Sequence, residues 1–147
     1  RMEPIRDRAG DEQGSALVEA SFAAVFLIAL VVAVFEFGMV FSSYVAVINA
    51  SRAGASYASM YPNPASAEYS RYADIARNEA RAARLNMERL EVLPPETPEG
   101  TDAGDPVRVT VVYRLRTFSS SISLPIFGRM GLPDTYTIRW ATTAPIR

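Results

Sequence analysis

An uninterrupted apolar stretch near the start of the chain constrains the fold more than any other feature. Residues 20–35 contain no charge, no glycine and no proline, and residues 5–61 contain no proline at all. Because proline is the strongest interrupter of helices, this spacing predicts one continuous helix over residues 15–58. That helix would be about 65 Å long, about twice the thickness of the hydrocarbon core of a bilayer. Its first half can cross a membrane, and its second half must project beyond it.

Charge and composition exclude most kinds of catalytic or binding site. Residues 15–60 carry only Glu19, Glu36 and Arg52, whereas residues 61–147 carry eleven arginines and ten acidic residues. The chain has no cysteine, histidine or lysine, which removes disulfides, thiolate or histidine metal sites, Ser–His–Asp catalysis and Schiff-base chemistry. A net charge of −1 disfavours nucleic acid as a partner. We therefore expect no enzymatic activity, no cofactor, no bound metal and no small-molecule substrate.

Two acidic residues stand out in the apolar segment. Glu19 lies one turn into the predicted helix, where the helix dipole would stabilise it at the headgroup level of a membrane. The alternative is that its carboxylate meets a cation on another chain, because an unpaired acid within a bilayer costs about 2.5–3.5 kcal/mol. Glu36 lies near the other end of the stretch, and we expect it at the far membrane edge or in a contact between helices.

The remaining residues, 61–147, predict a small domain with a helix and an antiparallel sheet. A second helix is expected over residues 67–85, because apolar residues recur there at helical spacing: Tyr69, Tyr72, Ala73, Ala76, Ala80 and Ala83. Alternating patterns predict strands over 88–93, 107–115, 118–124 and 135–140. They would form a three- or four-stranded sheet packed on one of the helices. The fold class is therefore α+β.

Two polar features of this domain are interpreted as solvent-exposed structure, and each has a binding site as its alternative. The loop over residues 94–106 carries four carboxylates, and we interpret it as an exposed turn, with a calcium site as the alternative. The arginines of the second helix predict a solvated face, with an anionic partner as the alternative. Glu68–Arg71 and Asp74–Arg77 are spaced to form ion pairs on that face.

Three short blocks resemble a known family. Residues 14–19 (GSALVE) resemble the class III prepilin processing site, at which a membrane peptidase cuts after the glycine. Together with residues 35–38 (FEFG) and 50–58 (ASRAGASYA), they resemble the TadE-like family of tight-adherence pilus systems. The chain departs from the usual family pattern at Ala20, where a phenylalanine is common.

The resemblance implies a pilin-like architecture and specific roles for residues. Residues 1–14 would be a leader or N-terminal extension, 15–60 the membrane and filament-core helix, and 61–147 a small extracellular domain. A prepilin peptidase would cut between Gly14 and Ser15, and Glu19 would pair with the freed Ser15 amine of a neighbouring subunit. If the leader stays attached, Arg6 or Arg8 of the neighbour would be the partner. The contacts between subunits are expected at Glu19, Phe22, Phe26, Leu30, Phe35, Glu36, Phe37 and Arg52.

The function expected from these observations is structural. The chain would sit in the bacterial inner membrane, interact there with the pilus assembly machinery, and then polymerise with copies of itself into an extracellular filament for surface attachment. The alternatives are a minor pseudopilin that primes assembly and a membrane-anchored binding module that does not polymerise.

Overall fold

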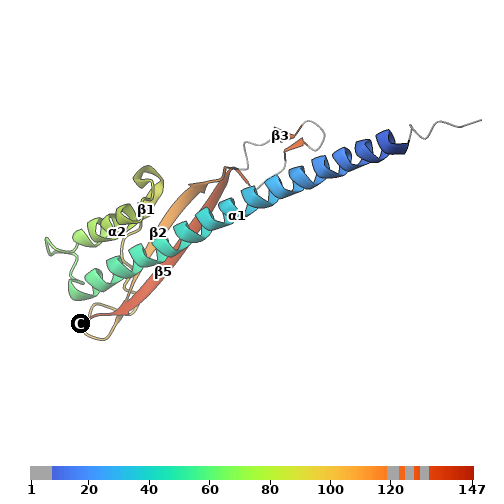
Figure 1. Ribbon diagram of the computed structural model, residues 1–147. Coiled ribbons are helices and arrows are strands. Elements are labelled where there is room, and N and C mark those ends of the chain that lie inside the picture. Colours follow the sequence, from blue (N-terminus) through green and yellow to red (C-terminus); the bar gives the residue numbers. More distant parts are fainter. Residues whose placement is uncertain (1–7, 119–122, 125–127, 130–132) are drawn as a thin grey trace, which may run out of the picture. The chain divides into compact units, whose positions relative to one another are not determined.

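The fold begins with one long helix, as the absence of proline predicts. The structure is a computed structural model that describes residues 8–118, 123–124, 128–129 and 133–147. Helix α1 (Arg8–Met60) runs without interruption and ends just before Pro62 (Figure 1). The predicted continuous helix is therefore confirmed, and it extends beyond both expected ends. The chain divides into two compact units, Arg1–Phe37 and Gly38–Arg147, and α1 contributes residues to both.

In the second unit, α1 presents a face of small residues to the core. The buried positions recur at spacings of three and four residues, as expected for one face of a helix. They are Ser43, Ala46, Val47, Ala50, Ser51, Gly54, Ala55, Ala58 and Ser59. Because these side chains are short, other elements can approach the helix backbone closely.

Helix α2 (Arg71–Ala82) is shorter than predicted at both ends. At the start, the backbone forms successive turns closed by hydrogen bonds between residues i and i+3, including Tyr69 N–H to the Ser66 carbonyl at 3.2 Å, and no continuous α-helical bonding. At the end, Arg84 adopts a positive φ of 61°, and Leu85 N–H donates to the Ala80 carbonyl at 3.1 Å. This pair of features is a Schellman ending, which stops the helix before residue 85.

The apolar stripe predicted for α2 is largely confirmed. Tyr72, Ala76 and Ala80 are buried, and Tyr69 and Ala73 are partly buried against them. The prediction was wrong for Ala83, which is exposed because it lies at the cap, where the helix has already ended.

The strands form an antiparallel sheet in the order β1-β2-β5, which confirms the α+β class. A 3₁₀ turn, η1 (Met87–Arg89), precedes β1 (Leu90–Val92), and β2 (Pro106–Arg116) pairs along its whole length with β5 (Thr135–Pro145). The short strands β3 (Ser123–Leu124) and β4 (Gly128–Arg129) pair with each other.

The strand predictions differ from the structure mainly at their ends. The strand expected over 88–93 begins with the 3₁₀ turn, because the Asn86 side chain accepts from Glu88 N–H at 2.9 Å and caps that turn. The strand expected over 118–124 was wrong at Phe118, which is in no strand, and residues 119–122 lie outside the described residues. The last strand continues five residues further than predicted, because β2 supplies a pairing partner up to Pro106.

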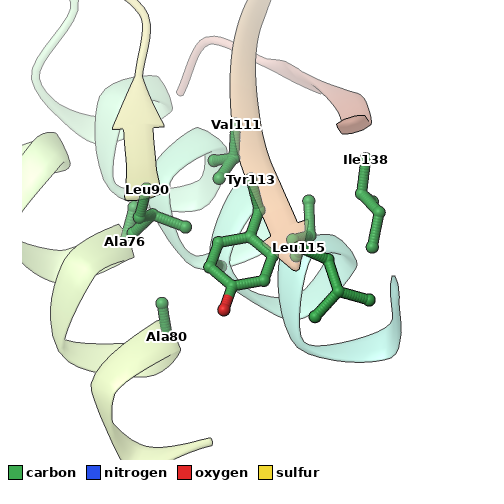
Figure 2. Close-up of a cluster of buried hydrophobic side chains, with 9 residues drawn as sticks. Ala76, Ala80, Leu90, Val111, Tyr113, Leu115 and Ile138 are labelled. Atoms are coloured by element: carbon green, nitrogen blue, oxygen red, sulfur yellow. The ribbon is translucent and has the colours of Figure 1, made fainter. Parts of the chain in front are cut away.

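The core of the second unit lies between the sheet and both helices. Strand β2 supplies Val111, Tyr113 and Leu115, and Figure 2 shows Tyr113 on the side of Ala80 of α2 and Leu115 beside Ile138. Leu90 of β1 and Ile138 of β5 belong to the same cluster, together with Val47 and Ala50 of α1. A second cluster continues the core toward the end of α1 and contains Ala55, Ala58, Tyr72, Val107, Val109 and Ile146. The sheet thus packs on both helices, where the sequence left the choice open.

Candidate assembly surface

Helix α1 carries a long exposed apolar segment, which we define as residues 17–41. Phe22 is 75% exposed and Phe26 is 71% exposed, and eleven further large apolar side chains in this range are at least half exposed. These eleven are Leu17, Val18, Val25, Leu27, Ile28, Leu30, Val31, Val34, Phe35, Phe37 and Phe41. Among the described residues, α1 is the one helix long and apolar enough to cross a membrane. So much exposed apolar surface is unfavourable in water and indicates that lipid or protein covers it.

The apolar side chains surround the helix and do not form a stripe. Phe22, Val25, Phe26, Leu27 and Ile28 follow one another closely and therefore point in different directions around the axis. A helix that is apolar on all sides belongs in a lipid bilayer or in the middle of a bundle. The exposed apolar segment therefore suits a membrane and also suits close packing with several other helices.

Gly14, Ser15 and Glu19 lie at the start of this segment, and all three are exposed. Helix α1 already includes them, so Gly14 and Ser15 are helical in the intact chain. Gly14 has no atom within 4 Å of the position where a Cβ would lie. The Ser21 hydroxyl donates to the Leu17 carbonyl at 2.8 Å, so this polar side chain is satisfied within the helix. Glu19 is the one charged side chain on the described helix between Gly14 and Phe35.

Glu36 differs from Glu19 in its exposure. It is only 3% exposed, while the flanking side chains Phe35 and Phe37 are 60% and 71% exposed. The two acids are 17 residues apart, which is about 25 Å along a helix. They bracket an uncharged stretch slightly shorter than the hydrocarbon core of a bilayer. The spacing of the two acidic residues can be read from the sequence, but nothing in the sequence indicates that Glu36 is buried.

The third block of the resemblance, residues 50–58, lies in the folded unit. A Cβ at Gly54 would lie 3.2 Å from Val109 Cγ1 and 3.3 Å from Ala76 Cβ, so α1, α2 and β2 approach one another closely at this glycine. Arg52 is exposed on the opposite side of the helix from these contacts. The small residues of the block thus serve the packing of the fold, and Arg52 is accessible to another molecule.

Two contacts between α1 and β5 were not expected from the sequence. The Ser51 and Thr142 hydroxyls lie 2.6 Å apart, and the rings of Tyr44 and Trp140 meet edge to face with centroids 5.6 Å apart. Near the end of α1, Arg147 N–H donates to the Ser59 carbonyl at 3.0 Å. These contacts join residues about 90 positions apart, so no local pattern could have indicated them. They show that α1 and β5 run side by side in the same direction.

The other polar predictions have mixed outcomes. The ion pairs Glu68–Arg71 (2.6 Å) and Asp74–Arg77 (3.7 Å) are both present. Within the described residues, no group of three or more acidic side chains is arranged to hold a metal ion, the loop over 94–106 included. Arg6 lies outside the described residues, and nothing is described of the Arg8 side chain, so the structure does not test either as a partner for Glu19.

Comparison with known proteins agrees with the resemblance in the sequence. A model of the TadE-like protein family matches residues 14–56, which covers the exposed apolar segment and most of the small-residue face of α1. No curated protein and no solved structure matches the chain. The matched range contains all eight residues expected in subunit contacts and both residues of the expected cleavage site. Over residues 14–56, less than a third of its length, the chain is therefore similar to the TadE-like protein family.

Proposed function

We propose that the chain is the structural subunit of an extracellular pilus-like filament. Its α1 helices lie in the inner membrane before assembly and pack against one another in the filament core afterwards. The observation that carries the proposal is the exposed apolar segment, in which large side chains such as Phe22, Val25 and Phe26 are exposed in different directions around the helix. The similarity to the TadE-like family over residues 14–56 supports the same structural role.

The energetic argument rests on the phenylalanine and leucine side chains of the segment. Moving one such side chain from water into a packed interior contributes about 1.5–3 kcal/mol. Phe22, Phe26 and Leu30 follow one another at four-residue spacing, so one face of the helix alone supplies several such contacts to a neighbour. We assign the contacts between subunits to these three residues together with Phe35 and Phe37, and Glu36 and Arg52 flank them.

In this proposal, Glu19 selects the register in which neighbouring subunits pack. Cleavage after Gly14 would create a positively charged amine on Ser15, and the Glu19 carboxylate of a neighbouring subunit would pair with it. A buried acid is costly without a partner, so an ion pair that forms in one register alone also selects that register. The exposure of Glu19 on the described helix leaves the carboxylate accessible for this pairing.

Electron microscopy of filaments sheared from cells tests the polymer directly. The wild-type chain should be the main component of the filaments, and Phe26→Glu should abolish them. The matched control is Ile75→Glu, which places the same charge on an exposed apolar position of α2 and should leave filaments intact. Filaments that lack the chain would contradict the proposal, and a low, substoichiometric content would identify a minor priming subunit instead.

Glu19→Gln separates assembly from membrane insertion. The variant removes a charge from the apolar segment, so it should insert at least as well as the wild type and yet form few filaments. Small oligomers of constant size in detergent, with no filaments for either protein, would point to a membrane-anchored binding module. Mass spectrometry of the mature N-terminus tests the cleavage, and the expected first residue is Ser15.

A further inference from the structure

We propose that the folded units of neighbouring copies join head to tail, with an acidic loop of one copy docked on an arginine patch of the next. We define the acidic loop as residues 94–106 and the arginine patch as Arg114, Arg116 and Arg139. The proposal rests on the filament of the proposed function and adds a second contact between its subunits. Both surfaces belong to the second compact unit, so the fold of that unit alone sets their spacing.

The arginine patch lies on the face of the sheet that points away from the helices. Arg114 and Arg116 are exposed and alternate along β2 with side chains that are buried in the core. Because successive side chains of a strand point to opposite faces, both arginines lie on the open face of the sheet. Arg139 is exposed on β5, next to the buried Ile138, and therefore belongs to the same face.

The register of β2 and β5 brings the three arginines together. Arg139 pairs with Val112, which lies two residues before Arg114 on the same face of β2. Arg139 and Arg114 are therefore diagonal neighbours, and Arg116 follows Arg114 on that face. Like charges at such close positions repel one another, so the cluster favours an anionic partner.

The patch keeps most of its positive charge within one copy. Glu91 reaches Arg114 at 3.9 Å, but both side chains are more than half exposed, and an isolated exposed pair contributes little. Within the part of the chain that the structure describes, no ion pair joins an acid to Arg116 or Arg139. This includes Asp134, which lies at the same end of the sheet.

The acidic loop lies at the opposite end of the sheet and carries the opposite charge. It holds four carboxylates and no arginine. It leads into β2 at Pro106, eight residues before Arg114, which is about 27 Å along a strand. Glu99 and Asp102 are exposed, and neither forms an ion pair with another described residue. Their carboxylates are therefore accessible to a second copy.

Hydrogen bonds hold the acidic loop in place before any docking. The Asp105 carboxylate accepts from Asp102 N–H at 3.0 Å, and Asp105 N–H donates to the Asp102 carbonyl at 3.1 Å. Ile146 N–H donates to the Asp105 carbonyl, and Gly104 N–H donates to the Ile146 carbonyl, both at 2.9 Å. The loop is thus tied to the residue that follows β5. A loop that is already ordered loses less entropy when it binds.

A second copy is the occupant because it brings the complementary charge in the orientation that a filament needs. Contact between two different surfaces keeps every copy in the same orientation and can repeat without closing. Packing of α1 helices side by side in one filament core requires that common orientation. Contact of the arginine patch with the same patch of another copy would turn one copy around and would bring like charges together.

Introduced cysteines test the contact, because the chain has none of its own. In R139C/D102C each copy carries one cysteine on each surface. Oxidation of filaments sheared from cells should then give a ladder of dimers, trimers and longer chains in non-reducing electrophoresis. R139C alone and D102C alone should stay monomeric, and filaments that contain both single variants should give dimers only.

The matched control is R81C/D102C, which moves one cysteine to α2 and should give no ladder. Filaments of R139C/D102C without a ladder would overturn the head-to-tail contact and leave the proposed filament standing. Dimers of R139C alone would show that the patch meets itself, which also overturns the contact. Absence of filaments from the wild type would overturn both proposals.

Charge reversal tests whether the attraction between the two surfaces drives the contact. R116E/R139E should form few filaments, because the patch then repels the acidic loop. R81E/R84E changes the net charge by the same amount on α2 and at its cap, and should form filaments normally. Addition of E99R/D102R to R116E/R139E should restore the filaments, because the two surfaces attract again.

Two results of the charge reversal would overturn the proposal. Normal filaments from R116E/R139E would show that the patch is not part of a subunit contact. A loss of filaments that E99R/D102R does not restore would show that the patch binds another anion, such as a lipid headgroup.

Discussion

The hydroxyl oxygens of Ser51 on α1 and Thr142 on β5 lie 2.6 Å apart, and Ser51 has no exposed surface. The Ser51 hydroxyl also donates to the Ile48 carbonyl at 3.0 Å. Because a hydroxyl has one proton to donate, Thr142 is the donor in its contact with Ser51. This bond links the helix to the edge strand of the sheet from within the core.

Removal of the Thr142 hydroxyl should weaken this link. Thr142→Val keeps the shape of the side chain and should lower the free energy of unfolding by about 0.5–1.5 kcal/mol, the usual net value of one hydrogen bond. Thr143→Val is the matched control, because Thr143 is exposed on the other face of β5. Denaturant unfolding in detergent measures both, and equal effects for the two variants would contradict the assignment.

Two of the glycines in α1, Gly54 and Gly38, should respond oppositely to replacement by alanine. A Cβ at Gly54 would lie 3.2 Å from Val109 and 3.3 Å from Ala76, so Gly54→Ala should destabilise the fold by about 1–3 kcal/mol through overpacking. Gly38 has nothing within 4 Å of that position, so Gly38→Ala should be stabilising by up to about 1 kcal/mol through helix propensity. Thermal unfolding in detergent gives the sign of each change. A stabilised Gly54→Ala would show that the three elements can separate at no cost.

Arg84→Gly should stabilise the end of α2. Arg84 adopts a φ of 61°, a conformation that costs a residue with a Cβ about 1–2 kcal/mol and that glycine adopts freely. The expected net gain is about 0.5–1 kcal/mol, because glycine also increases the entropy of the unfolded chain. Arg81→Gly, in the last turn of the same helix, should instead destabilise by about 1 kcal/mol. Both free energies of unfolding come from denaturant titration, and a destabilised Arg84→Gly would count against the Schellman ending.

The contact of Tyr57 and Arg71 with Glu68 should make stability depend on pH. Glu68 accepts from Arg71 at 2.6 Å and from the Tyr57 hydroxyl at 2.7 Å. The hydrogen bond from Arg71, and then that from Tyr57, holds the pKa of Glu68 below its ordinary value. The hydrogen bond to Glu68 raises the pKa of Tyr57, because the neutral phenol is the form that donates.

The pKa shifts of Glu68 and Tyr57 each predict how the stability of the fold changes with pH. A carboxyl with a lowered folded pKa stabilises the fold above the unfolded value, and this contribution is lost as the pH falls through the folded pKa. A phenol with a raised folded pKa stabilises the fold below its unfolded value and loses this contribution as the pH rises through the folded one. Melting temperatures across acid and alkaline pH should therefore fall more steeply for the wild type than for Glu68→Gln. Parallel profiles would refute the contact.

The architecture of α1 could be predicted from the sequence because its causes are local. The absence of proline over residues 5–61 permits one helix, and the lack of charge over residues 20–35 marks its apolar part. The alternation of Val107, Val109 and Val111 with polar residues likewise indicated the central strand. These patterns depend on residues within one or two turns of each other, so one sequence is sufficient to reveal them.

Tertiary structure decided what each face contacts. Distant contacts determine the roles of three residues of α1. Gly54 packs against Val109, Ser51 forms a hydrogen bond with Thr142, and Tyr44 packs against Trp140. These partners lie 55 to 96 residues further along the chain. The extra length of β5 follows from its pairing with β2, and the burial of Glu36 has no local signal. Periodicity shows which side chains avoid water, but which distant groups cover them depends on how the whole chain packs.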